Sequence, residues 1–280
     1  MTMLESLRRH WREYLAEAVG LGLFMVSACL FGALLWHPAS PASRVVPDGL
    51  GRRALMGTAM GLTAVGLIYS PWGQRSGAHL NPATTLTFWR LGKVSGADAV
   101  WYGIAQVLGG LAGVLLAGAL LGPALAHPAV HYVVTAPGAG VAAAFVAEIA
   151  ITFVLMTVVL HVSNTARVAG MTGLCAGLLV AVYIILEAPI SGMSMNPARS
   201  LASAAPAGAW EHLWIYFVAP PLGMLAAAEA YVRWHGLAGV YCAKLHHDSG
   251  TGCIFRCRFG EMAAARPATT SMAAAARPSA

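Results

Sequence analysis

The chain has 280 residues, of which 58% are hydrophobic and only 10% are charged, and its mean hydropathy is +0.67. Soluble domains carry about 25% charged residues, so this composition argues against a soluble enzyme, a disordered protein and a nucleic-acid-binding protein. The formal net charge of +6 does not change that conclusion, because the basic residues lie between apolar stretches rather than in one cluster. The composition predicts a polytopic α-helical membrane protein.

Six apolar stretches are long enough to cross a bilayer as helices, which takes about 20 residues each. They cover residues 14–36, 54–72, 99–122, 140–162, 168–187 and 212–232. Lysines and arginines outside these stretches concentrate on the side of the N-terminus, whereas Arg44, Arg52 and Arg53 lie on the other side. By the positive-inside rule, both termini are expected in the cytoplasm, in an integral protein of the plasma (inner) membrane.

Composition divides the chain into three parts. Residues 1–13 form a basic N-terminal segment, 14–235 hold the six spans, and 236–280 form a cytoplasmic tail. The tail contains cysteines and histidines, followed by an Ala/Pro/Thr/Ser-rich stretch whose composition predicts disorder. The membrane part divides again into a first half, about 14–122, and a second half, about 140–232.

One motif occurs once in each half. Residues 76–84 read Ser-Gly-Ala-His-Leu-Asn-Pro-Ala-Thr, and residues 191–199 read Ser-Gly-Met-Ser-Met-Asn-Pro-Ala-Arg. An Ala-Glu pair also recurs in the first span of each half, at Glu17 and Glu148. Because three spans per half place the halves in opposite orientations, the pattern predicts an inverted repeat.

Each Asn-Pro-Ala motif is expected to begin a short helix, because Asn is a favoured N-cap and Pro a favoured first helical residue. The first helix should cover about 82–91, and the second should end near 205, before Pro206. At this length each spans roughly 13–15 Å, about half of the hydrocarbon core. Two half-helices from opposite sides would meet at the bilayer midplane, at Asn81 and Asn196.

In this setting the pair of motifs resembles the aquaporin, or major intrinsic protein, family. The resemblance extends from about Tyr14 to Arg233 and is carried by Asn81, Pro82, Ala83, Asn196, Pro197, Ala198, Arg199, Glu17, Glu148 and Gln106. It implies an all-α fold with six transmembrane helices and two re-entrant half-helices. It also implies a homotetramer with one pore per subunit. The sequence contains no evident phosphate-binding loop, Ser/His/Asp arrangement or catalytic carboxylate pair, and its charge pattern is not that of a nucleic-acid-binding protein, so we expect no cofactor, no enzymatic activity and no nucleic-acid partner.

The resemblance assigns roles to several of these residues. Asn81 and Asn196 would donate side-chain N–H groups to permeating water where the helix dipoles are electropositive; capping alone is the alternative. Arg199 would belong to the narrow selectivity filter, and the alternative is an arginine that snorkels to the interface. Glu17 and Glu148 would brace the re-entrant loops, with a transporter's proton relay as the alternative.

Three further filter positions follow from their spacing to the motifs in the family. They are Ile184, Met193 and either Met60 or Gly61; strict spacing selects Gly61, whereas the local Gly61-Leu62-Thr63 selects Met60. Core packing is the alternative reading for all of them.

The filter matches neither standard pattern of the family. Water-selective members place an aromatic residue at the second-span position and a histidine at the position of Ile184. Glycerol-conducting members carry an aromatic pair and an aspartate after the arginine, where this chain has Ser200. We therefore expect one strong donor, Arg199, against apolar walls.

The tail brings four potential metal ligands close together in sequence: His246, His247, Cys253 and Cys257. Thiolates and imidazoles suit Zn²⁺ or a copper ion, and a cytosolic tail keeps its thiols reduced. Their spacing is not a usual zinc pattern, so incidental cysteines are the alternative.

The sequence thus predicts a passive channel for water, or for water and small uncharged solutes, that excludes protons and ions. Three alternatives stay open. One is a glycerol-type facilitator, and another is an ion-coupled secondary transporter, since broken helices and inverted repeats are common there. The third is a closed, channel-like protein that senses metal through its tail.

Overall fold

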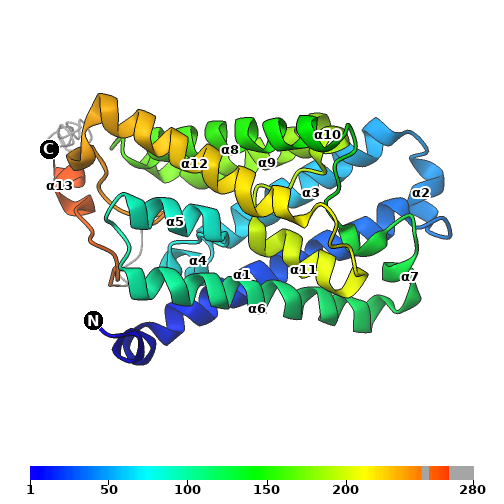
Figure 1. The fold of residues 1–280 in the computed structure, drawn as a ribbon, viewed down its shortest axis with the longest axis horizontal. Coiled ribbons are helices and arrows are strands. Elements are labelled where there is room, and N and C mark those ends of the chain that lie inside the picture. The colour runs from blue at the N-terminus through cyan, green and yellow to red at the C-terminus, as the bar shows by residue number, and fades with distance from the viewer. Residues whose placement is uncertain (248–251, 265–280) are drawn as a thin grey trace, which may run out of the picture.

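The computed structural model describes residues 1–247 and 252–264, and every regular element of these residues is a helix (Figure 1). The Ala/Pro/Thr/Ser-rich stretch predicted to be disordered lies largely outside the described residues. Six long helices correspond to the six predicted spans: α1 (Met3–Trp36), α3 (Gly49–Tyr69), α6 (Gly96–Leu121), α8 (Val141–Ser163), α9 (Thr172–Leu186) and α12 (Leu213–His235).

Among the described residues, five helical stretches are long and apolar enough to cross a membrane: α1, α6, α8, α12 and Ala169–Leu186, which joins the 3₁₀ turn η2 (Ala169–Met171) to α9. The remaining long helix, α3, begins with Arg52 and Arg53 in its first turns. These two arginines lower its mean hydropathy, although the rest of the helix is apolar. The predicted span over 54–72 also ends earlier, at Tyr69.

The N-terminal segment is helical and continues directly into the first span. Thr2 caps α1 together with Glu5, and the helix runs from Met3 with a local break at His10. His10 and Tyr14 both reach Asp98 at the start of α6, at 2.7 and 2.6 Å. Residues 1–13 thus belong to the same helix as the first span, and the buried contacts of Ser6 and His10 with Asp98 hold them against α6.

Two half-helices begin at the repeated motifs, as the sequence predicts. They are α5 (Pro82–Arg90), capped by Asn81, and α11 (Pro197–Ala207), capped by Asn196. The predicted end before Pro206 is wrong: α11 includes Pro206 in its last turn. The helix then ends at Gly208, whose left-handed conformation directs its N–H to the last carbonyls.

Short helices and turns connect the long ones: α2 (Pro41–Val45), α4 (Pro71–Ser76), α7 (Pro123–Ala126), η1 (His131–Val133), α10 (Ala188–Ser191), η3 (Leu237–Gly239) and α13 (Phe259–Ala264).

The long helices pack in a pattern that repeats between the halves. α1 lies along α6 and α8 along α12, so the first and third spans of each half are neighbours, while α3 lies along α9. Glycines allow the close approach: Gly109 and Gly113 of α6 face the backbone of α1 at Ala18 and Gly22. Figure 1 shows α5 and α11 between the long helices α6 and α12, with the N-terminus and α13 at the same end of the bundle.

The described part of the tail packs on this end of the bundle instead of extending from it. Val240, Ala243, Leu245 and Phe255 are buried in the same apolar cluster as Phe88 of α5. The tail thus shares the core of the membrane part.

We expect Gly109→Ala to destabilise the bundle, because a Cβ at this position would collide with the backbone of Ala18. Overpacking of this kind costs about 1–3 kcal/mol. Gly103→Ala in the same helix is the matched control, since its added Cβ meets no atom within 4 Å. Thermal unfolding in detergent should show a lower midpoint only for Gly109→Ala, and equal midpoints would contradict the close packing of α1 on α6.

Candidate functional site

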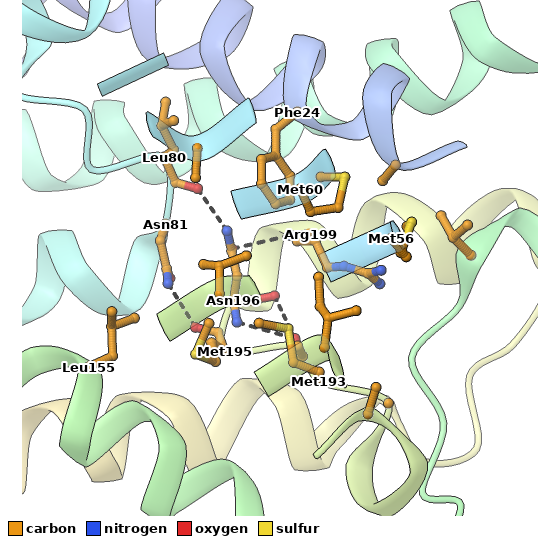
Figure 2. A pocket seen from close by; sticks show the side chains of 18 of the residues that line it. Phe24, Met56, Met60, Leu80, Asn81, Leu155, Met193, Met195, Asn196 and Arg199 are labelled. Atoms are coloured by element: carbon orange, nitrogen blue, oxygen red, sulfur yellow. Dashed lines mark hydrogen bonds between the residues drawn. The ribbon is translucent and has the colours of Figure 1, made fainter. Parts of the chain in front are cut away.

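A cavity of about 460 Å³ passes between the two halves of the bundle. Trp36 and Arg53 line one end, and His79 and Leu245 line the other, which we call the inner mouth because it lies at the end of the bundle that carries the N-terminus and α13. Its walls are mostly apolar and come from both halves, and Asn81, Asn196 and Arg199 supply polar groups along it (Figure 2).

The two motif asparagines are cross-connected between the halves. Asn81 Nδ2 donates to the carbonyl oxygen of Met195 at 2.7 Å, and Asn196 Nδ2 donates to that of Leu80 at 2.7 Å (Figure 2). Their Oδ1 atoms accept from the first turns of their own half-helices, from the N–H of Ala83 and of Ala198. Each amide group therefore caps one half-helix and ties it to the opposite loop.

The loops that precede the half-helices have the same unusual backbone conformation. Ala78 and Leu80 in the first loop and Met193 and Met195 in the second all have φ between 49° and 54°. The left-handed conformation costs about 1–2 kcal/mol for each residue with a Cβ. Both loops therefore need strong support from their surroundings.

Glu17 supplies this support in the first half. Its carboxylate accepts hydrogen bonds from the N–H groups of His79 and Leu80, at 3.0 and 2.6 Å. Ser76 Oγ and Gln106 Nε2 each donate to it at 2.7 Å. The side chain is 0% exposed and does not line the cavity, so its acceptor capacity is directed at the loop.

Glu148 has the equivalent position in the second half. It accepts from the N–H groups of Ser194 and Met195, at 2.6 and 2.8 Å, and from Ser191 Oγ at 2.8 Å. It is also 0% exposed and lies off the cavity wall. The two predicted glutamates thus make symmetric contacts, each with the two N–H groups that a re-entrant loop leaves without a helical partner.

The predicted filter residues come together on the cavity wall. Arg199, Ile184, Met193 and Met60 all line the cavity, and Figure 2 shows Met60 and Met193 on opposite sides of Arg199. Gly61 does not line it, because it packs against the backbone of Gly177 in α9. Of the two candidates from α3, Met60 is therefore the one that faces the cavity.

Arg199 retains hydrogen-bonding capacity at this place. Its backbone N–H donates to Asn196 Oδ1 at 3.2 Å, which fixes the residue in the first turn of α11. Among the described residues, no group accepts a hydrogen bond from its Nη1 atom. A guanidinium carries five N–H donors, and those on Nη1 of Arg199 can therefore donate to a solute in the cavity.

Sequence reasoning missed most of the residues that line the cavity, among them Phe24 and Leu245. Phe24 of α1 lies beside Met60 (Figure 2), so an aromatic ring reaches this level from the first span. Its signal was the helical spacing of Leu21, Phe24 and Ala28, which all line the cavity. Leu245 of the tail had no comparable signal, because nothing in its local sequence ties it to the membrane part.

The cluster of potential metal ligands in the tail differs by one residue from the predicted set. His247, Cys253 and Cys257 come together with Cys242, and the four ligand atoms lie within 4.8 Å of one another. His246 is not a member of this cluster, since its ring lies against that of Tyr69, with centroids 4.6 Å apart. Neighbouring residues of a non-helical segment point to different sides, which separates His246 from His247.

Comparison with known proteins agrees with this architecture. Residues 3–231 match the family model "Major intrinsic protein". Aquaporin NIP1-1 of Oryza sativa subsp. japonica is 32% identical over 80% of this chain and 81% of its own length. Putative aquaporin NIP4-1 of Arabidopsis thaliana is 38% identical over 61% of this chain; that alignment spans 59% of the relative.

A solved structure shows the same fold. The aquaglyceroporin from Plasmodium falciparum superposes with a TM-score of 0.68 at 21% sequence identity, over 79% of this chain and 95% of that one. With six long helices, two half-helices that meet at Asn-Pro-Ala motifs, and a family match over most of its length, the chain belongs to the major intrinsic protein family.

Proposed function

We propose that the chain is a passive membrane channel through which water and small uncharged solutes pass in single file. The meeting of the two half-helix N-termini at the cavity, through Asn81 and Asn196, carries this proposal. Each asparagine amide has two N–H donors, and the crossed bond to the opposite loop uses one. The other is free to donate to the oxygen atom of a permeating molecule.

Ions and protons are excluded in this proposal by the electrostatics of the same place. The N-termini of α5 and α11 carry partial positive charge, and both point at the level of the asparagines. Arg199 adds a full positive charge on the cavity wall. A hydrated cation would lose solvation there and gain no anionic partner, whereas a neutral molecule with an oxygen acceptor would gain hydrogen bonds.

The filter favours permeation by solutes larger than water. Met60, Ile184 and Met193 offer Arg199 no polar partner, and methionine side chains adapt their shape to what lies next to them. A solute such as glycerol would present hydroxyl oxygens to Arg199 and carbon atoms to these walls. This supports a facilitator for small polyols as the second candidate function.

An ion-coupled transporter is the weaker alternative. Among the described residues, no aspartate or glutamate lines the cavity. Glu17 and Glu148 are the candidates for a titrating pair, but both accept hydrogen bonds from loop N–H groups. Both are buried and lie off the cavity wall. A coupling ion would find no carboxylate ligand along the path.

For the membrane arrangement, we propose cytoplasmic termini in the plasma membrane and a homotetramer. The N-terminus and α13 lie at one end of the bundle, and the positive-inside rule assigns that end to the cytoplasm. Large apolar side chains such as Leu62, Leu108 and Leu178 are exposed on the outside, where lipid or neighbouring subunits would cover them. The tetramer is proposed from the family alone.

Glu148→Gln should lower both stability and water permeability. The introduced amide would place an NH₂ group against the loop N–H groups, and an unsatisfied buried donor costs about 1–3 kcal/mol. Glu229→Gln is the control, since Glu229 forms an exposed ion pair with Arg90, which is worth about 0–1 kcal/mol. Permeability of Glu148→Gln proteoliposomes equal to that of the parent protein would argue against loop bracing.

Stopped-flow light scattering on proteoliposomes tests the filter, first in a sucrose gradient and then in a glycerol gradient. We expect rapid water flux and measurable glycerol uptake. Ile184→His should reduce glycerol uptake more than water flux, because it adds a polar partner for Arg199 and narrows the passage. The exposed residue Arg233, changed to Ala, serves as the control. An equal reduction of water flux and glycerol uptake by Ile184→His would contradict the assignment of Ile184 to the filter.

A further inference from the structure

The C-terminal strap, which we define as residues 240–247 and 252–258, passes directly over the inner mouth of the cavity. The backbone N–H of Leu245 donates to the carbonyl oxygen of Gly77 at 3.1 Å, in the loop that leads to the first motif. His79 Nε2 lies 2.8 Å from the carbonyl oxygen of Ala243. The Leu245 side chain then joins His79 in lining the end of the cavity.

Aromatic packing fixes the second arm of the strap to the same place. Phe255 stacks on the ring of His79 with centroids 5.3 Å apart and an interplanar angle of 8°. Phe88 of α5 stacks on His79 at 5.2 Å. Gly77 has no space for a side chain, because a Cβ there would lie 2.8 Å from Phe255.

Further contacts attach the strap around the rim of the inner mouth. The N–H of Tyr241 donates to Asn164 Oδ1 at 2.7 Å, beyond the end of α8. The N–H of Arg256 donates to the carbonyl oxygen of Lys93 at 3.0 Å, between α5 and α6. Since α5 and α8 belong to opposite halves, the strap bridges the two halves across the mouth.

The docked strap also buries a charge at a cost. Lys244 is 3% exposed, and among the described residues its Nζ atom has no hydrogen-bond partner. Burying an ammonium group without a partner is unfavourable. A further restraint on these residues would offset this cost.

The Cys/His cluster is placed to provide this restraint. Cys242 and His247 come from the first arm of the strap, and Cys253 and Cys257 come from the second. Cys242 Sγ lies 3.6 Å from Cys253 Sγ, and His247 Nε2 lies 3.1 Å from Cys257 Sγ. In a tetrahedral zinc site with Zn–S bonds near 2.3 Å, neighbouring sulfurs lie about 3.8 Å apart.

The surroundings of the cluster also suit a metal–thiolate site. The N–H of Phe259 donates to Cys257 Sγ at 3.4 Å, the kind of outer hydrogen bond that supports a thiolate ligand. The His247 ring stacks on Phe259 with centroids 4.3 Å apart, which fixes its orientation.

From these observations we propose that Cys242, His247, Cys253 and Cys257 bind a Zn²⁺-class ion, and that this ion holds the strap across the inner mouth and restricts permeation. The metal site stands on the cluster alone, whereas the control of permeation rests on the proposed channel function. The free energy of metal binding to such a site also stabilises the folded arrangement of its ligands. Loss of the ion therefore releases both arms of the strap and opens the inner mouth.

Metal binding is measured first, on the full-length protein purified under reducing conditions. Elemental mass spectrometry should find about one zinc per chain. Cobalt substitution should give the thiolate-to-cobalt bands and the d–d bands of a tetrahedral site. Cys253→Ser should weaken the affinity by more than about 100-fold, the upper range for losing an outer-shell partner. Cys175→Ser in α9, outside the cluster, is the matched control.

Water permeability is then compared in the same proteoliposomes with zinc and after chelation. We expect chelation to raise the permeability severalfold in the parent protein and in Cys175→Ser. His247→Ala should be permeable from the start and should not respond to zinc or chelator. Leu245→Ala, which removes the side chain at the mouth and no ligand, should raise the zinc-bound permeability while zinc binding is retained.

The outcomes separate the metal site, the restriction and the channel. Absence of bound zinc or cobalt in the parent protein overturns the site, as does a Cys242–Cys253 disulfide found by mass spectrometry of the reduced preparation. Zinc binding with equal permeability before and after chelation overturns the restriction. If the parent protein binds zinc but shows no water flux with zinc, after chelation or in the His247→Ala variant, the metal site is retained. The channel function and its regulation by the metal are then both overturned.

Discussion

Backbone amides of the two loops that lead into the half-helices, buried inside the bundle, impose the constraint on which the whole structure depends. The loops at 77–81 and 192–196 are not helical, and in a membrane such a backbone is tolerated only when protein or a wet cavity satisfies its polar groups. Glu17 and Glu148 accept the loop N–H groups, and the crossed bonds of Asn81 and Asn196 engage the carbonyls of the opposite loops. Each half therefore completes the hydrogen bonding of the other.

This mutual support explains why the polar groups of the cavity are so few. The carboxylates are used inside the protein, so the polar groups that face the cavity beside the half-helix N-termini include the donors of two asparagines and Arg199. Donors without acceptors favour neutral oxygen-bearing molecules over cations. The same arrangement that makes irregular backbone stable at this depth thus determines the chemistry offered to a solute.

The C-terminal strap adds a second level to this architecture. Ala243 and Phe255 of the strap contact His79, two residues before Asn81. The strap therefore both borders the inner mouth and packs against the loop that leads to the first motif. A change in how the strap docks would reach the cavity through Leu245 and His79 without altering the filter at Arg199. In the proposed channel, selectivity at Arg199 and access at the inner mouth therefore depend on different residues.

The sequence by itself determined the membrane class, the long helices, the starts of both half-helices and the inverted repeat. These features depend on local patterns: the length of apolar stretches, the capping preference of Asn-Pro, and a motif that recurs. Tertiary structure alone decided that Met60 and not Gly61 faces the cavity, and that Cys242 replaces His246 in the metal-ligand cluster. It also brought Leu245 and Phe255 to the inner mouth. The reason is that the direction of one side chain, and the meeting of segments far apart in the chain, depend on how helices pack, which no single stretch of sequence specifies.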